Sequence, residues 1–67
     1  GESYSVMVHD LAGRRVRGLA AGRGDGGEQV VTWDGRSDAG ERAAPGVYLV
    51  RLKRGAEVES RTIVLQR

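Results

Sequence analysis

The chain has 67 residues, of which 39% are hydrophobic, and its formal net charge at pH 7 is +2. A chain of this length forms one domain, and such a domain buries only about 60% of the surface that its unfolded chain exposes, so its stability is marginal. The sequence contains no cysteine, which excludes disulfide bonds and thiolate metal sites, and no apolar run approaches the roughly 20 residues that a membrane-spanning helix requires.

The first predicted element is a β-hairpin. Residues 3–9 alternate between apolar and polar side chains, which is typical of a half-buried strand. A turn follows, because the Asp10 carboxylate can accept hydrogen bonds from the nearby backbone and Gly13 can adopt a positive φ angle. Residues 14–19 resume as the second strand, with Val16 as its inward-facing residue.

Residues 20–27 are predicted to form a loop that crosses between sheets, because they hold four glycines and no large apolar side chain. A glycine-rich loop can also bind phosphate, but that site needs a helix directly after the loop, and residues 28–33 have the pattern of a strand. The tripeptide Arg23-Gly24-Asp25 matches an integrin-binding motif, which arises readily by chance in a chain rich in these residue types. We therefore predict a structural loop.

The predicted third strand, residues 28–33, is apolar on both faces. Val31 and Trp33 share one face, whereas Val30 and Thr32 share the other. A sheet with one solvated side shows a cleaner alternation of apolar and polar residues. We therefore expect a neighbouring element to cover the second face of this strand.

The longest predicted loop spans residues 34–45 and is rich in turn-forming residues. Aspartates cap turns and glycines supply positive φ angles, while the proline opens the next strand because it cannot lie within a central strand. The residues predicted to form the turns of the chain are Asp10, Gly13, Asp34, Gly35, Asp38, Gly40, Pro45 and Gly46.

A calcium site in this loop is the alternative interpretation. Calcium requires several converging oxygen ligands, and the candidates are Asp34, Asp38 and Glu41, with Asp25 as a further carboxylate. Their spacing does not follow the EF-hand pattern, and turn formation already explains both loop aspartates. We predict no bound metal and no cofactor.

Two further strands complete the predicted fold. Residues 47–54 are the most apolar segment, Gly55-Ala56 forms a short hairpin turn, and residues 58–66 form the closing strand. No segment of ten residues shows helical periodicity, so we predict an all-β domain with about five strands. The predicted core consists of Val6, Val8, Val16, Val31, Trp33, Tyr48, Val50, Leu52, Ile63 and Leu65.

The residue types of catalytic sites are scarce in this sequence. His9 is the only histidine, and nucleophilic catalysis requires a serine or cysteine beside a base. Paired catalytic carboxylates need a cleft, for which a domain of this size has little room. The sequence therefore predicts a protein that is not an enzyme.

The basic side chains are interspersed with acidic ones, which predicts a solvated surface. A nucleic-acid-binding face needs basic residues gathered together with exposed aromatic rings. The two basic groups, residues 14–17 and 51–54, lie apart in the sequence, and Trp33 and Tyr48 are predicted to face inward. A small, basic barrel that binds nucleic acid is an alternative that this pattern does not favour.

Five short motifs, spread over nearly the whole chain, form a recognisable set. They are the segment 8–16, with the sequence VHDLAGRRV, then Trp33-Asp34-Gly35, Asp38-Ala39-Gly40, Pro45-Gly46-Val47-Tyr48 and Thr62-Ile63-Val64-Leu65. The set resembles the immunoglobulin (Ig)-like domain of FlgD-type flagellar hook-capping proteins. It is also similar to the C-terminal Ig-like, type IX secretion sorting-like domains of secreted bacterial proteins. His9 stands where members of this family usually carry an aromatic residue.

The resemblance implies a small antiparallel Ig-like β-sandwich with a structural, non-catalytic role in an exported bacterial protein, outside the cell or at its surface. It does not indicate one specific role, because such modules are attached to many unrelated proteins. Family members carry an extended segment before the part that corresponds to Gly1, so we expect a sandwich without its opening strand.

Two hypotheses follow from the expected missing strand. In the first, another chain donates a strand that completes the sheet, and the module belongs to an oligomer or filament. In the second, the module is a C-terminal spacer or secretion-sorting domain cut from a larger secreted protein, whose other domains are its partners. Neither hypothesis involves a nucleic acid or a membrane span.

Overall fold

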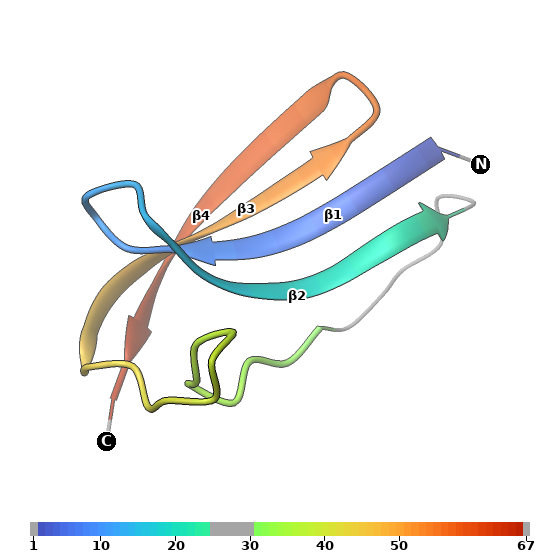
Figure 1. The fold of residues 1–67 in the computed structure, drawn as a ribbon. Coiled ribbons are helices and arrows are strands. Elements are labelled where there is room, and N and C mark those ends of the chain that lie inside the picture. The colour runs from blue at the N-terminus through green and yellow to red at the C-terminus, as the bar shows by residue number, and fades with distance from the viewer. Residues whose placement is uncertain (1, 25–30, 67) are drawn as a thin grey trace.

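The computed structural model describes residues 2–24 and 31–66, which form an all-β fold (Figure 1). Within these residues there are four antiparallel strands and no helix. The strands are β1 (Glu2–His9), β2 (Arg15–Gly24), β3 (Gly46–Arg54) and β4 (Glu57–Leu65), and they lie in the order β2-β1-β3-β4 in one open sheet. The predicted antiparallel all-β class is thereby confirmed, and the described residues form one sheet of four strands where a sandwich of about five was expected.

The first hairpin, β1 and β2, closes through a hydrogen-bonded turn. Asp10 Oδ1 accepts hydrogen bonds from the backbone N–H groups of Ala12 (3.0 Å) and Arg14 (2.8 Å). Gly13 has a φ of 88°, a conformation that a residue with a Cβ atom rarely adopts. The guanidinium of Arg14 also forms an ion pair with Asp10 (3.0 Å). Local side-chain chemistry therefore reverses the chain at this point.

The predicted loop over residues 20–27 is wrong in its first half, because β2 continues to Gly24. Gly22 lies directly opposite Tyr4 of β1, and a Cβ atom added to Gly22 would be 3.6 Å from Tyr4 Oη. An aromatic ring packed over a cross-strand glycine compensates for the missing side chain. Pairing with β1 therefore overcomes the low strand propensity of these small residues. Residues 25–27, including Asp25, lie outside the described residues.

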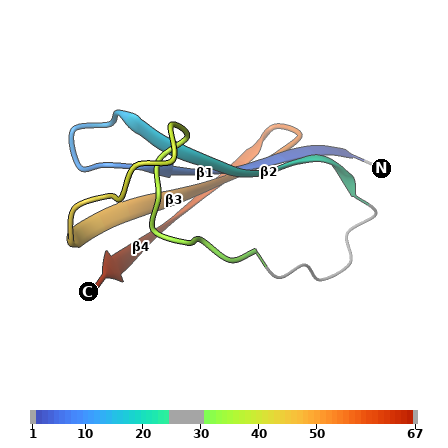
Figure 2. The same ribbon diagram turned by 60° about the horizontal axis from the view of Figure 1, so that its bottom comes forward.

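The predicted strand over residues 28–33 also needs correction. Residues 28–30 lie outside the described residues, and residues 31–33 belong to no strand. Segment 31–45 runs instead as irregular chain along one face of the sheet and leads into β3 (Figure 2). The predicted core includes Val31, but its side chain is 38% exposed. No ladder of strand pairing directs this side chain toward the sheet.

The core lies on one face of the sheet, the inner face, which carries Val6, Val8 and Tyr48. These three residues are buried, and Val8 has no exposed surface. Direct cross-strand neighbours share a face, so Leu52 lies beside Val6 and Ile63 beside Tyr48 on the inner face. The other residues of the predicted core are half-buried: Val16, Trp33, Val50, Leu52, Ile63 and Leu65.

The opposite side of the sheet, the outer face, is also partly apolar. Met7 and Leu49 are half-buried near its centre. Three valines toward β4 are more open to solvent, with 41% of Val47, 53% of Val58 and 63% of Val64 exposed. The β3–β4 side of the outer face thus presents apolar surface next to a sheet edge.

Candidate functional site

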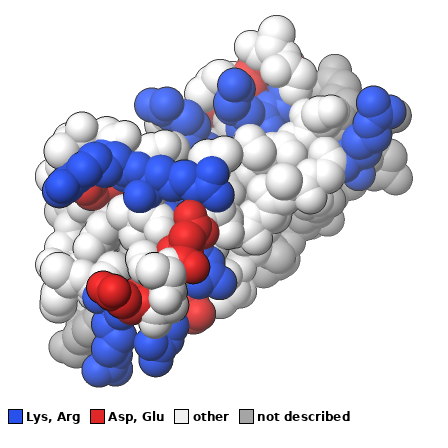
Figure 3. Space-filling model, viewed as in Figure 1, with Lys and Arg blue, Asp and Glu red and all other residues white. Residues whose placement is uncertain are grey.

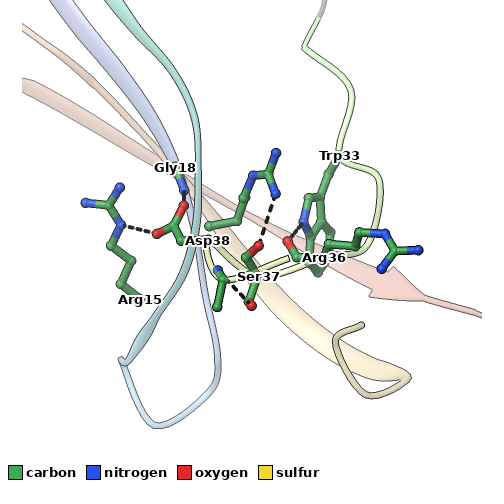
Figure 4. Close-up of polar contacts among 8 residues, drawn as sticks. Arg15, Gly18, Trp33, Arg36, Ser37 and Asp38 are labelled. Atoms are coloured by element: carbon green, nitrogen blue, oxygen red, sulfur yellow. Dashed lines mark hydrogen bonds and ion pairs between the residues drawn. The ribbon is translucent and has the colours of Figure 1, made fainter. Parts of the chain in front are cut away.

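Two aromatic rings attach segment 31–45 to the inner face. The rings of Trp33 and Tyr48 meet edge to face, with centroids 5.2 Å apart and an interplanar angle of 71°. The indole N–H of Trp33 donates to the Arg36 carbonyl (2.8 Å; Figure 4). The Tyr48 hydroxyl donates to the Ala44 carbonyl. A tyrosine near the start of a strand that bonds the backbone a few residues upstream matches the tyrosine corner of Ig-like sandwiches.

The same loop contains a first turn at residues 34–36 and an inner turn at residues 37–40, which is enclosed by the hydrogen bond from the Ala43 N–H to the Gly35 carbonyl (2.8 Å). Asp34 Oδ1 accepts a hydrogen bond from the Arg36 N–H (2.9 Å) and so closes the first turn. In the inner turn, Gly40 has a φ of 82° and donates its N–H to the Ser37 carbonyl (2.9 Å). This inner turn holds Asp38 at its tip.

Asp38 joins the loop to the exposed edge of β2 (Figure 4). Its Oδ1 atom accepts a hydrogen bond from the Gly18 N–H, and its Oδ2 atom accepts one from Arg15 Nε, each at 3.0 Å. The Asp38 N–H in turn donates to the Val16 carbonyl (2.9 Å). The residue that the sequence predicts as a local turn cap therefore connects segments 20 positions apart.

Hydrogen bonds from the backbone lower the pKa of two aspartates. The N–H of Gly18, together with the charge of Arg15, lowers the pKa of Asp38 below its ordinary value. In the β1–β2 turn, the N–H of Arg14 lowers the pKa of Asp10 in the same direction. Both carboxylates remain open to solvent, so these contacts fix local geometry more than they add to stability.

β4 forms the other edge of the sheet. Gly55 and Ala56 make a two-residue turn, so the flanking residues Arg54 and Glu57 form a hydrogen-bonded pair. Hydrogen-bonded and non-hydrogen-bonded residue pairs then alternate along the antiparallel β3–β4 ladder. Every second residue of β4 consequently turns its backbone N–H and C=O groups away from β3. These residues are Val58, Ser60, Thr62 and Val64, and no strand among the described residues pairs with them.

The two edges of the sheet differ in how well they are protected. The register of β2 against β1 shifts twice, and Asp38 occupies backbone groups of Val16 and Gly18. β4 keeps one regular register along its whole length and contains no proline. Bulges and covering loops discourage unwanted strand pairing, as do charged side chains that face inward. Bulges and a covering loop act on β2, whereas β4 has neither among the described residues and carries the inward-facing charges of Glu59 and Arg61.

The sequence pattern of the FlgD Ig-like domain matches residues 2–57 of this chain. The matched range includes β1, β2, segment 31–45 and β3. The chain belongs to the FlgD Ig-like domain family. The resemblance to the FlgD-type domain is thus confirmed over residues 2–57, which contain all the short motifs except Thr62-Ile63-Val64-Leu65. No curated protein and no solved structure gives a significant match to the chain.

A FlgD Ig-like domain is a non-catalytic β module, and His9 is part of its sheet. His9 lies in the sheet between Arg15 of β2 and Leu49 of β3, and its ring is half-buried. Its Nδ1 atom is buried and has no hydrogen-bond partner among the described residues. His9 thus sits within the ladder, paired on both sides by strands of the sheet.

The calcium candidates of this FlgD Ig-like domain do not form a metal site in the described part of the chain. No group of three histidine, cysteine or acidic residues that could hold a metal ion occurs there. Asp34 accepts a backbone hydrogen bond, and both carboxylate oxygens of Asp38 are occupied by protein donors. Glu41 contributes its carbonyl to the inner turn, where the Ser37 N–H donates to it (2.8 Å).

Charge is distributed over the domain without one dominant sign. On the side shown in Figure 3, lysine and arginine groups are separated by acidic and uncharged surface. In the described ranges, no helix is long and apolar enough to span a bilayer. These observations leave the open β4 edge as the most distinctive feature of the surface.

Sequence reasoning found the turn residues but missed two features of the site. The bond from Asp38 to Gly18 has no local signal, because the two residues are brought together only by the fold. The open edge did have a signal. Residues 57–65 form a regular strand without glycine or proline that follows a two-residue hairpin turn.

Proposed function

We propose that this FlgD Ig-like domain is a structural assembly module of an exported bacterial protein, and that it accepts a β-strand from a protein partner along β4. The observation that carries the proposal is the regular outer edge of β4, which no described strand pairs, in a sheet whose other edge is bulged and bound by Asp38. An extended segment adds to such an edge through main-chain hydrogen bonds, while side-chain contacts supply specificity.

The outer face supports the same proposal. Val58 and Val64 belong to β4, Val47 lies on the adjacent strand, and all three are exposed. A strand added beside β4 would cover part of this apolar surface, so backbone pairing and apolar burial would act together.

Amide hydrogen exchange followed by NMR tests the proposal. The amides of Val58, Ser60, Thr62 and Val64 should exchange rapidly in the dilute chain, whereas the alternate amides of β4 should be protected. Addition of an extended peptide of alternating valine and threonine, or an increase in chain concentration, should protect the open amides. If neither change protects them, the proposal of strand addition is wrong.

A matched pair of variants isolates the backbone edge. Thr62→Pro removes an outward-pointing N–H, and proline is tolerated at such positions of edge strands. Thr62→Val keeps the N–H and the strand propensity. We expect Thr62→Pro to abolish the added protection and Thr62→Val to retain it, with the circular dichroism spectrum checking that both variants keep the sheet.

A role as a C-terminal spacer or secretion-sorting domain is the second candidate, and the motifs shared with sorting-like domains favour it. Fusion of the chain to a reporter protein in a bacterium with type IX secretion tests this role. Reporter activity outside the cell or at its surface would support it. Retention of the reporter inside the cell would contradict both the sorting role and the proposed exported location.

A further inference from the structure

We propose that the strand accepted by β4 is β4 of a second copy of this chain, paired antiparallel and centred on Ser60. The inference rests on the strand-addition role proposed above and names its occupant. In this register, Val58, Ser60 and Thr62 of each copy exchange backbone hydrogen bonds with Thr62, Ser60 and Val58 of the other. Two four-stranded sheets then join into one continuous sheet across a two-fold axis.

The charges of β4 select this register. Glu59 and Arg61 lie on the inner face, because they pair with the inner-face residues Leu52 and Val50 of β3. With Ser60 opposite Ser60, Glu59 of each copy lies opposite Arg61 of the other. The neighbouring registers place Arg61 opposite Arg61, or Glu59 opposite Glu59. They bring like charges into the closest cross-strand positions, with about 4.5 Å between Cα atoms.

A hollow on the inner face adjoins the same edge. It is lined by Leu52 and Arg54 of β3 and by Glu57 and Glu59 of β4. In the Ser60-centred register, Arg61 of the second copy starts opposite Glu59 and diagonal to Glu57, a separation that a long side chain can bridge. Its guanidinium can donate to both carboxylates, while its aliphatic stem covers Leu52. The hollow thus matches the one basic side chain that the second β4 places next to it.

The outer face is compatible with the same pairing. Val58 of one copy lies opposite Thr62 of the other, on the side of the sheet where Val58 is 53% exposed. Pairs of β-branched residues are favourable cross-strand neighbours. The second copy therefore pairs opposite charges on the inner face and β-branched side chains on the outer face.

Cysteine cross-linking tests the register directly, because the chain has no native cysteine. Ser60→Cys places two thiols across a hydrogen-bonded pair, where the Cα separation of about 5.5 Å suits a disulfide. Thr62→Cys is the control, since its two thiols are offset by four residues, about 13 Å along the strand. We expect oxidation to yield a covalent dimer of Ser60→Cys only. A dimer of Thr62→Cys alone would overturn the register.

Charge exchange gives an independent test by sedimentation equilibrium. Arg61→Glu creates two Glu–Glu pairs in the dimer and should raise its dissociation constant about tenfold. The double variant Glu59→Arg/Arg61→Glu restores opposite charges in both pairs and should recover the wild-type constant. Lys53→Glu changes the net charge equally but lies on β3, so it should have little effect. Failure of the double variant to recover, with its circular dichroism unchanged, would contradict the inference.

The outcomes separate this inference from the role on which it rests. If the concentrated chain stays monomeric while the valine–threonine peptide still protects the open β4 amides, the second copy is the wrong occupant and strand addition stands. If the chain dimerises but Ser60→Cys does not cross-link, the register is wrong. If a higher chain concentration protects the β4 amides from exchange and only Ser60→Cys cross-links, the results support both the strand-addition role and the second copy as its occupant.

Discussion

The Asp38 carboxylate couples the attachment of the loop to pH. Because the Gly18 N–H and the charge of Arg15 lower its pKa in the folded chain, the unfolded chain holds the proton more tightly. The stability that Asp38 contributes is therefore complete above its ordinary pKa of 3.8 and is lost as the pH falls through the lower folded value. The lowered pKa of Asp10 has an effect of the same sign.

Thermal unfolding from neutral to strongly acidic pH checks this coupling. We expect the Tm of the wild-type chain to decrease at pH values below the ordinary aspartate pKa. Asp38→Asn should lower Tm at neutral pH and make the decrease of Tm in acid shallower. Glu41→Gln removes a charge from the same loop and controls for net charge. An unchanged pH profile in Asp38→Asn would show that the bonds to Gly18 and Arg15 do not contribute to stability.

Trp33 is the largest side chain that fastens the loop to the sheet. Trp33→Ala removes the ring contact with Tyr48 and the bond to the Arg36 carbonyl. Large-to-small changes of this kind cost about 3–5 kcal/mol, which is comparable to the whole stability of a marginal domain. We expect Trp33→Ala to show no cooperative transition in urea. Tyr48→Phe, which loses only the hydroxyl bond to Ala44, should still unfold cooperatively after a loss of about 1 kcal/mol.

The β3–β4 hairpin depends on glycine at the first position of its turn. Gly55 has a φ of 56°, and every positive φ angle among the described residues belongs to a glycine. A residue with a Cβ atom pays roughly 1–2 kcal/mol in this conformation, so Gly55→Ala should lower the free energy of unfolding by about that amount. Ala56→Gly is the control, because the second turn position needs no positive φ. Equal losses in the two variants would contradict the turn assignment.

The elements that the sequence predicted well are those determined by local chemistry. Alternation identified β1, and apolar composition identified β3. The turns at Asp10 and Gly55 were visible because their residues act within a few positions. The strand predicted over residues 28–33 was wrong at residues 31–33, because β-forming residues make a strand only where a neighbouring strand pairs with them. At residues 31–33 the chain lies over the sheet instead of within it, and Trp33 packs by its ring.

The opposite error, at the end of β2, has the related cause that tertiary contacts override propensity. Alanine and glycine favour a loop, yet the neighbouring strand supplies both the backbone ladder and the Tyr4 ring that covers Gly22. The same limit applies to the site. The turn role of Asp38 could be predicted, but its bond to β2 could not, because that partner is set by the fold.

The molecule as a whole combines a small core with an open edge, and the two properties are linked. Only Val6, Val8 and Tyr48 are buried hydrophobic residues in the described part of the chain. One sheet covered by irregular chain leaves the other large apolar side chains of this part half-buried or exposed. A domain of this size therefore has little stability to spare. Any partner that binds only the folded chain therefore contributes directly to how much of it is folded.

This linkage predicts that Tm depends on protein concentration. Association of two folded chains through β4 stabilises the folded state by mass action, so Tm of the wild-type chain should rise steadily as its concentration increases. Thr62→Pro blocks the backbone pairing and should make Tm nearly independent of concentration, whereas Arg61→Glu, with its dissociation constant raised about tenfold, should shift the rise in Tm to about tenfold higher concentrations. The double variant Glu59→Arg/Arg61→Glu should regain the dependence. A wild-type Tm that stays constant as the concentration increases would show that the second copy adds nothing to the stability of the fold.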